Sequence, residues 1–261
     1  MIQMRVDGGD KAGNVSRALE RIAEAATAGA QVIILPEVLT LGWTHPSALT
    51  EGESVPGGET CQRLGASAKQ HGVYVCAGLA EHAGYKNYNT AVLFSPQGEL
   101  LLHHRKIHEL AIGHPYYALG DRLQVMDTPL GRFGLMICAD GFAPGQTISR
   151  ALAMMGAEFI LSPSAWAVPA DYDNFREPYG KLWRDNYGPV CADYGIWIAG
   201  VSNVGPVSAG PWEGRKCIGC SLLVGPDGKQ ALMGPFGETA EAILYHEIQL
   251  SSGKERIGPR D

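Results

Sequence analysis

The sequence predicts an α/β protein whose sheet contains both parallel and antiparallel strands. Apolar strand-like runs alternate with helix-like segments along most of its 261 residues. Two pairs of strands are separated only by short turns, at residues 96–98 and 225–228, which is typical of β-hairpins. Because strands joined by helices pair in parallel and hairpin strands pair antiparallel, these patterns together indicate a layered α/β domain with a mixed sheet.

The first half of the chain opens with a strand that is reduced to residues 2–6, either because this edge strand is short or because the start codon is assigned late. A helix is expected over residues 14–29, where apolar side chains recur on one face and Gly29 provides a C-terminal stop. The other expected elements of this half are a helix at 59–71 and strands at 32–35, 73–79, 89–95 and 99–105.

The second half continues the alternation up to a polar tail. Strands are expected at 132–137, 158–162 and 196–201, helices at 145–156 and 177–194, and a final hairpin at 221–233. From residue 251 the chain is polar and shows no periodicity. We therefore expect a single domain over residues 1–250, followed by a polar C-terminal tail over residues 251–261.

The composition argues against several classes of protein. The net charge is -6 and no run of Lys or Arg exceeds two residues, so a nucleic-acid partner is not expected. No apolar stretch approaches the roughly 20 residues that span a membrane, and the N-terminus lacks the apolar core of a signal peptide. The six cysteines do not read as a secreted disulfide scaffold, and Cys217 and Cys220 lack a second pair to complete a zinc site. A cytoplasmic protein that binds neither membrane nor metal is expected.

Three reactive side chains each stand at the end of an apolar run, namely Glu37, Lys106 and Cys138. In open α/β sheets ligands gather at the carboxyl ends of strands, so these three can surround one crevice. A thiolate is a suitable nucleophile toward an amide carbon, but it needs a neighbouring base or positive charge. We expect Cys138 to attack and Glu37 to move protons. Lys106 and the backbone N–H of Ala139 are expected to stabilise the oxyanion.

These three segments resemble the Glu, Lys and Cys motifs of the nitrilase (carbon–nitrogen hydrolase) superfamily, in the same order and with comparable spacing. The resemblance extends over most of the chain and includes residues 14–37, 155–166, 196–205 and 218–228. It implies a four-layer αββα sandwich with mixed sheets that dimerises. It also implies hydrolysis of nonpeptide C–N bonds with no metal or organic cofactor.

The sequence departs from the family pattern at the second glutamate that many members carry. Counting back from the Gly120-Asp121 pair reaches Gly113 and His114, and the only glutamate between Lys106 and Gly120 is Glu109. Positioning of water or substrate is therefore expected to fall to His114, to Glu109, or to neither. The aromatic residues that follow the candidate strands are candidates for the pocket wall, namely Trp43, Tyr116 and Trp166.

The leading hypothesis is a thiol amidohydrolase acting on a small amide, and the Asp140-Gly141 pair after the cysteine favours amidase-like members. A ureide (N-carbamoyl) hydrolase or a nitrilase on the same triad remains open. A carbamoyl substrate with a carboxylate would need extra contacts, for which His45 and Arg176 are candidates. The partners expected are thus a small amide, ureide or nitrile and a second copy of the chain. An alternative from another class is a catalytically weak binding or assembly protein that retains the fold.

Overall fold

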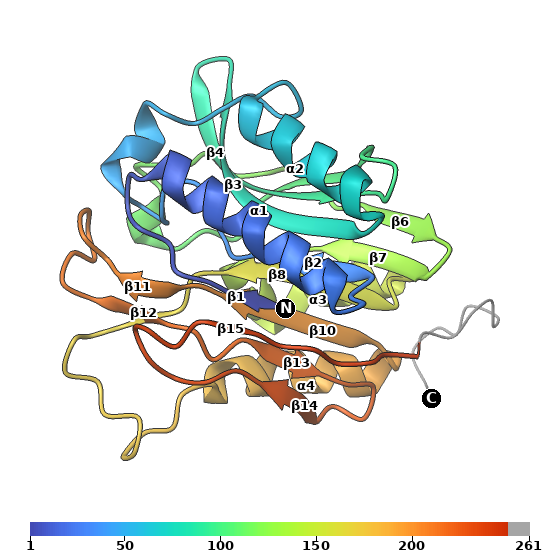
Figure 1. The fold of residues 1–261 in the computed structure, drawn as a ribbon. Coiled ribbons are helices and arrows are strands. Elements are labelled where there is room, and N and C mark those ends of the chain that lie inside the picture. Colours follow the sequence, from blue (N-terminus) through green and yellow to red (C-terminus); the bar gives the residue numbers. More distant parts are fainter. Residues whose placement is uncertain (250–261) are drawn as a thin grey trace.

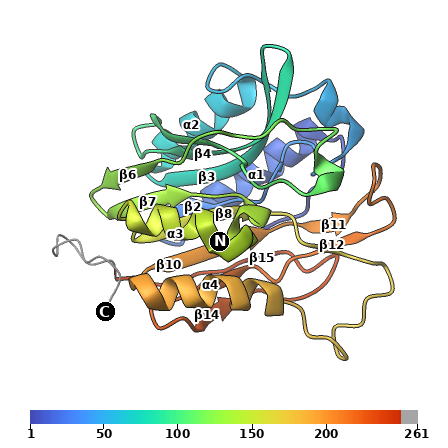
Figure 2. The same ribbon diagram turned by 180° about the vertical axis from the view of Figure 1, so that it is seen from behind.

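Two β-sheets pack face to face, and two helices cover the outer face of each (Figures 1 and 2). The computed structural model describes residues 1–249. The helices α1 (Lys11–Thr27) and α2 (Glu59–His71) lie in front in Figure 1. The helices α3 (Thr147–Met154) and α4 (Lys181–Tyr194) lie in front in Figure 2, where the molecule is seen from behind. The layer order is therefore helices, sheet, sheet, helices, and the four-layer αββα prediction is confirmed.

The first sheet carries two of the three predicted reactive residues at one edge. Its strands, in order across the sheet, are β2 (Val32–Ile34), β3 (Tyr74–Ala83), β4 (Lys86–Phe94) and β5 (Leu100–Arg105). β2 and β3 are parallel, whereas β3 with β4 and β4 with β5 are antiparallel. β5 therefore runs in the direction of β2, and both strands end at the same edge of the sheet.

The second sheet has a parallel centre and antiparallel edges. Its strands, in order, are β14 (Gln230–Met233), β13 (Leu222–Val224), β10 (Trp197–Ser202), β8 (Phe159–Ser164), β7 (Gly131–Leu135) and β6 (Val125–Thr128). The central strands β10, β8 and β7 are parallel, and the outer strands pair antiparallel. Both sheets are thus mixed, as the alternation of helices and hairpins indicated.

The fold also contains two smaller sheets. The strand β1 (Ile2–Gln3) pairs with β15 (Ala242–Ile243), so only part of the segment expected as a strand at 2–6 forms one. The other small sheet consists of β11 (Val204–Pro206), β12 (Lys216–Ile218) and β9 (Ala167–Val168). The β11–β12 hairpin projects beyond the main sheets at the left of Figure 1.

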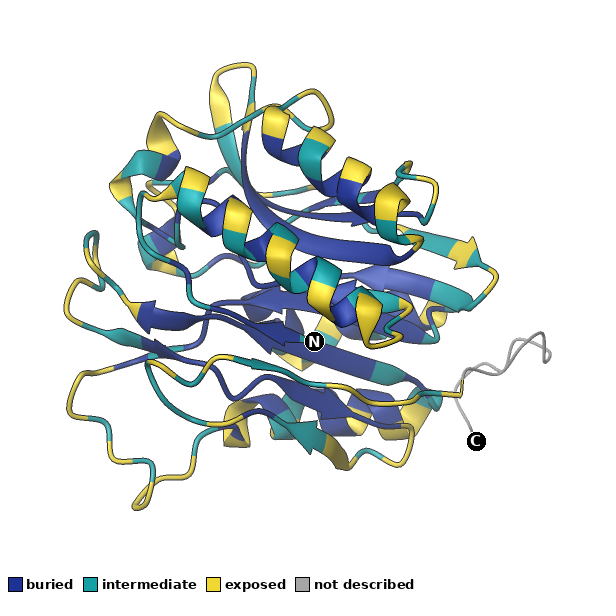
Figure 3. Cartoon of the chain, viewed as in Figure 1, coloured by how far each residue is buried: buried dark blue, intermediate teal, exposed yellow. Residues whose placement is uncertain are grey.

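Successive residues of the inner strands pack against different layers. Ile33 and Val75 belong to the core formed with α1 and α2, whereas their neighbours Ile34 and Cys76 belong to the core between the sheets. Successive side chains of a strand point to opposite faces, so a strand between helices and a second sheet must be apolar on both faces. This explains the continuous apolar runs of the sequence. Figure 3 shows the result, with dark blue strands beneath helices that are exposed only outward.

Some boundaries differ from the sequence expectations. The helix expected over 177–194 begins only at Lys181, because Gly180 has a φ of +107° that a helix does not accommodate. The helix expected over 145–156 begins at Thr147, after a short 3-10 turn at Pro144–Gln146. The apolar pattern does not predict β6, β9, β11 or β12, because these strands are short or half-exposed. The tail expected over 251–261 lies outside the described residues. Within residues 1–249 we find no helix with the length and apolarity needed to span a bilayer.

Candidate active site

The three predicted residues follow strands that end where the two sheets pack against each other, and this boundary is called the seam below. Glu37 comes soon after β2, Lys106 directly after β5 and Cys138 soon after β7. All three side chains are buried, with exposed fractions of 1% for Glu37, 2% for Lys106 and 8% for Cys138. Of the three residues, Cys138 is thus the most exposed.

Glu37 stands in a turn that joins the two sheets. Its backbone N–H donates to the carbonyl oxygen of Ser164, at the end of β8, over 3.1 Å. The neighbouring strand β3 comes very close, since a Cβ on Gly78 would lie 2.5 Å from the Glu37 Cα. Glycine is therefore required at position 78 for the turn to sit against β3. The turn fixes the backbone of Glu37 from both sides.

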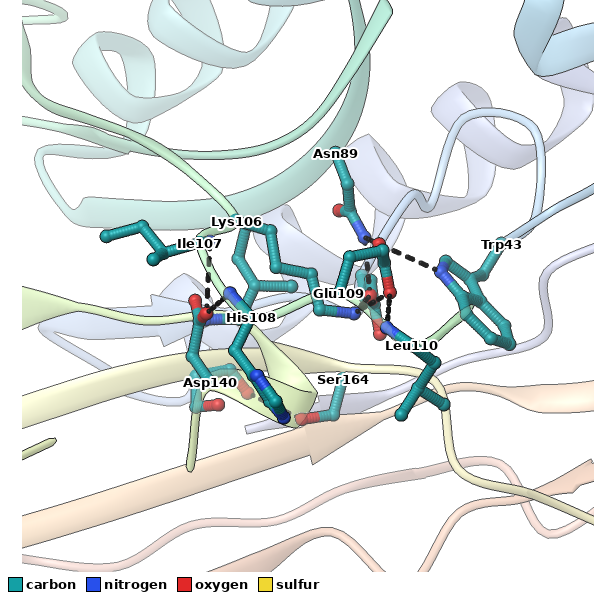
Figure 4. A network of polar contacts seen from close by, with 12 residues as sticks. Trp43, Asn89, Lys106, Ile107, His108, Glu109, Leu110, Asp140 and Ser164 are labelled. Atoms are coloured by element: carbon teal, nitrogen blue, oxygen red, sulfur yellow. Dashed lines mark hydrogen bonds and ion pairs between the residues drawn. The ribbon is translucent and has the colours of Figure 1, made fainter. Parts of the chain in front are cut away.

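Lys106 lies between two carboxylates. Its Nζ is 2.8 Å from Oε1 of Glu37 and 2.8 Å from Oε1 of Glu109. Its backbone N–H donates to the carbonyl oxygen of Asn89 over 2.8 Å, which holds the residue against β4. Figure 4 shows Lys106 reaching toward Glu109, with Asn89 above them. The prediction that the acid and the amine would meet agrees with this geometry.

Asn89 is a site residue that the sequence reasoning missed. Its Nδ2 donates to Glu37 over 2.6 Å and to Glu109 over 3.1 Å, so it bridges the two acids. The indole N–H of Trp43 also donates to Glu109, over 3.4 Å (Figure 4). A signal was present, because an asparagine within a buried strand is unusual unless its amide is needed there.

Cys138 begins a 3-10 turn, Cys138–Phe142, with a φ of +43°. Such a conformation costs a residue with a side chain about 1–3 kcal/mol, and it persists only where the surroundings impose it. The backbone amide of Ala165 forms a hydrogen bond with the thiol. The N–H of Ala139 lies in the first turn, where an amide has no partner inside the helix. Both amides therefore belong to the immediate surroundings of the sulfur.

The turn that carries the thiol is held by the carboxylate of Asp140. One oxygen accepts from the backbone amides of Ile107 and His108, over 3.1 and 2.7 Å, as Figure 4 shows. The other accepts from the amide of Ile137, over 2.9 Å, and lies 2.8 Å from Nε2 of His104. Burial alone would raise the pKa of Asp140, but these hydrogen bonds and the charge of His104 hold it below its ordinary value. An ionised Asp140 thus ties the Cys138 turn to the segment after Lys106.

The electrostatics of the three residues follow from burial and mutual charge. Burial raises the pKa of Glu37, against the opposing effect of the Lys106 ammonium. For Lys106 burial would lower the pKa, but the carboxylates of Glu37 and Glu109 raise it well above the ordinary value. Burial and the Glu37 charge raise the pKa of Cys138, which Lys106 partly offsets. The resting site therefore favours a protonated amine and a neutral thiol beside an acid that holds a proton readily.

The other residues predicted for the pocket lie in different surroundings. Glu109 joins the site, whereas His114 is exposed at the end of the 3-10 turn Ala111–Gly113. Trp166 is only 2% exposed and stacks on Trp183 at 4.5 Å between ring centroids. Tyr116 and Trp43 are half-buried and pack against one small cluster of buried apolar residues that includes Tyr117.

Of the two residues considered for a substrate carboxylate, Arg176 has an 89% exposed side chain that pairs with Asp173. His45 lines a hollow near the site, together with Trp43 and Ala165. Among residues 1–249, no cluster of His, Cys, Asp and Glu side chains is arranged to hold a metal ion.

Comparison with known proteins gives one consistent result. A family model described as carbon-nitrogen hydrolase matches residues 1–257. A nitrilase of Pyrococcus abyssi is 33% identical over 241 residues, which cover 91% of this chain and 84% of the relative. The omega-amidase NIT2 of Homo sapiens is 34% identical over an alignment that covers 96% of this chain and 87% of the relative.

A solved structure shares the fold. It is a cysteine-to-serine mutant of the Nesterenkonia AN1 amidase from the nitrilase superfamily, with a TM-score of 0.77 and 21% sequence identity. The match covers 92% of this chain and 87% of that one. At this identity the likeness concerns the arrangement of helices and strands.

Proposed function

The chain belongs to the carbon–nitrogen hydrolase family, and from that premise we propose that it hydrolyses a small amide through a thioester formed on Cys138. The observation that carries the proposal is the position of Lys106 between Glu37 and Glu109, at the seam where the Cys138 thiol is held. The members of the family act on nonpeptide C–N bonds, and this constellation suits an acyl transfer to sulfur.

In the first half of the reaction, Sγ of Cys138 attacks the amide carbon while Glu37 accepts the thiol proton. The tetrahedral intermediate collapses as its C–N bond breaks, and Glu37 gives the proton to the departing nitrogen. In the second half, Glu37 takes a proton from water as the water oxygen attacks the thioester carbon. The C–S bond then breaks, and Glu37 returns the proton to the sulfur of Cys138. The sum is amide plus water giving carboxylic acid plus ammonia or an amine.

The burial of the acid supports this role. Because burial raises the pKa of Glu37, its carboxyl group holds a proton more readily than an exposed acid and can both accept and return it. The pKa of Cys138 is also raised by burial, so the thiol is neutral at rest. Proton transfer to Glu37 therefore accompanies the attack, instead of preceding it as a stable thiolate would require.

Negative charge on the substrate oxygen is stabilised by Lys106 and by the backbone N–H of Ala139. A preorganised donor of this kind contributes about 3–4 kcal/mol to the transition state. Glu37 and Glu109 keep the Lys106 ammonium charged and fix its direction. Two acids around one amine are thus needed for different purposes, one for proton transfer and one for positioning.

Two other substrate classes use the same three residues. A ureide with a carboxylate would need a cation in the pocket, and the exposure of Arg176 weakens that alternative. A nitrile remains an alternative for the same nucleophile and is compared in the assay below. The alternative of a catalytically weak binding or assembly protein rested on the missing second glutamate. Glu109 contacts Lys106 over 2.8 Å, so the reason for that alternative is removed.

Ammonia release from propionamide, propionitrile and N-carbamoylglycine tests the proposal. We expect release from the amide by the unaltered protein, and a loss of at least about 10⁴-fold in kcat for Cys138→Ala. Cys61→Ala is a matched control, since it removes another buried thiol outside the site. Brief reaction followed by mass spectrometry should find an acyl group on Cys138. Activity that survives Cys138→Ala would overturn the nucleophile assignment.

We further propose that residues 1–250 form one domain and that the chain acts as a homodimer, in the cytoplasm. Apolar side chains on the outer side of α3 and α4 support an interface there, because Met154 is 65% exposed and Leu182 is 50% exposed.

A further inference from the structure

A tryptophan that is far from the catalytic residues in the sequence lies one side chain away from them in the fold. Trp212 belongs to the loop that joins β11 and β12, and it is half-buried. Its ring centroid lies 5.0 Å from that of Trp43, with an angle of 70° between the two rings. This edge-to-face arrangement stabilises a pair of aromatic rings beyond the apolar area that they bury. Trp212 thus holds the ring of Trp43 in one orientation.

Trp43 in turn contacts both members of one ion pair of the candidate site. Nζ of Lys106 lies 5.5 Å from the centroid of the Trp43 ring, within the range of a cation–π interaction. The indole N–H of Trp43 donates to Glu109 over 3.4 Å, as Figure 4 shows. Lys106 and Glu109 are themselves 2.8 Å apart. The orientation of this single indole therefore affects the direction in which the Lys106 ammonium points.

The loop that carries Trp212 is fixed against the turn that carries Trp43. Gly210 has a φ of +90°, and a Cβ at this position would strike the carbonyl oxygen of Thr44. Both observations require glycine where the two backbones meet. The guanidinium of Arg215 lies 4.3 Å from the centroid of the Trp212 ring, in a second cation–π contact. Trp212 is therefore held by its own loop and does not depend on Trp43 for its place.

We propose that Trp212 is a positioning residue for the hydrolysis. It holds Trp43 against Lys106 and Glu109, and the β11–β12 hairpin thereby helps to fix the direction of the ammonium that stabilises the oxyanion. This role rests on the proposed amidase function. The direction of the ammonium matters most when negative charge develops on the substrate oxygen, so the loss of Trp212 should lower kcat and leave KM nearly unchanged.

Steady-state ammonia release from propionamide tests the role of Trp212. We expect Trp212→Leu to lower kcat by about 3- to 10-fold, with KM changed by less than about twofold. Trp212→Phe keeps an aromatic ring beside Trp43, so its kcat should stay within about twofold of that of the unaltered protein. Each kcat is divided by the folded fraction of the same variant, obtained from urea unfolding, so that a loss of stability alone does not lower the value.

Trp197→Leu is the matched control, because Trp197 is a half-buried tryptophan that packs beside His246, outside the site. This variant should keep the kcat of the unaltered protein. A kcat for Trp212→Leu that equals the value of the unaltered protein would overturn the proposal. So would an equal loss in Trp212→Leu and Trp212→Phe, because the ring would then not be the feature that matters.

A double-mutant cycle tests whether Trp212 acts through Trp43. Trp43→Leu removes the ring that Trp212 holds, so the further change Trp212→Leu should then cost less than about twofold in kcat. The same loss with and without the Trp43 ring would refute the proposed path. If Trp43→Leu does not fold, Trp43→Phe replaces it in the cycle. Phenylalanine has no N–H to donate to Glu109, so the loss from Trp212→Leu should again shrink, and an undiminished loss would refute the path equally.

The unaltered protein separates the role of Trp212 from the function on which it rests. If it releases no ammonia from propionamide, the amidase function fails, and the role of Trp212 fails with it. If it hydrolyses propionamide and Trp212→Leu does so equally well, only the role of Trp212 fails.

Discussion

The carboxylate of Glu109 occupies a space that exists because residue 113 has no side chain. A Cβ placed on Gly113 would lie 2.7 Å from both Cγ and Cδ of Glu109 and 3.0 Å from its Oε1. Such distances are too short for these atoms to stay in place. Position 113 is not in the left-handed region, so alanine is acceptable to the backbone itself. Gly113→Ala should therefore act by displacing Glu109 from Lys106.

The expected size of the effect follows from what Glu109 contacts. Its Oε1 bonds to Nζ of Lys106 over 2.8 Å and to the amide of Leu110 over 2.9 Å, and its Oε2 accepts from Asn89 over 3.1 Å. Overpacking a filled site costs about 1–3 kcal/mol. If about 2–3 kcal/mol of this cost appears in the transition state, kcat/KM falls by about 30- to 150-fold.

A double-mutant cycle measured by ammonia release from propionamide isolates the contact. Glu109→Ala removes the atoms that the new Cβ would strike, so Gly113→Ala should then cost less than about threefold. The comparison uses the unaltered protein, each single variant and the double variant. Equal losses from Gly113→Ala with and without the Glu109 side chain would refute the idea that Gly113 acts through Glu109.

Two further predictions concern buried carboxylates. Asp140→Asn should lower the free energy of unfolding by about 2–4 kcal/mol. The new amide nitrogen would face backbone N–H groups from which the carboxylate now accepts hydrogen bonds. Urea unfolding at neutral pH measures this, and a loss below about 1 kcal/mol would contradict it. Burial alone would raise the pKa of Glu81, but hydrogen bonds from His103, Arg105 and Thr90 lower it to about 2. The pKa of Glu81 is thus lower in the folded than in the unfolded protein, and the ionised carboxylate stabilises the fold by about 3 kcal/mol. This stabilisation is complete above the ordinary carboxyl pKa and is lost as the pH falls toward about 2. Asp140 also has a depressed pKa, so Glu81→Gln should still lose stability in acid. Urea unfolding at several pH values should show a larger acid loss in the unaltered protein than in Glu81→Gln, and parallel pH profiles would disprove the assignment.

Much of the site could be predicted because its residues interrupt apolar runs. Glu37, Lys106 and Cys138 each follow a buried strand, where a polar side chain needs a specific reason. The expectation that ligands gather at the carboxyl ends of strands placed these side chains together, and the structure agrees for β2 and β5, which run in the same direction. The fold class followed in the same way, from helices and hairpins between those strands.

What the sequence left open depends on backbone paths that side-chain patterns do not encode. Counting along the chain leads to Gly113 and His114, but the 3-10 turn there exposes His114 and leaves the inner space to Glu109. Asn89 was missed because a strand residue can face either layer, and the sequence does not say which. The hollow beside Trp43 was also hidden, because its walls come from segments far apart in the chain, including Trp43 and Asn203.

The seam between the sheets accounts for both the geometry and the chemistry of the site. The acid and the amine come from one sheet and the thiol from the other, so no single strand can align them. The amide of Glu37 bonds to Ser164 of the second sheet, and Asp140 bonds back to the segment that follows Lys106 in the first. The same packing that joins the sheets excludes water from the Glu37 carboxyl and raises its pKa. The raised pKa that suits Glu37 to carrying a proton is therefore in large part a consequence of sheet packing, which the charge of Lys106 partly offsets.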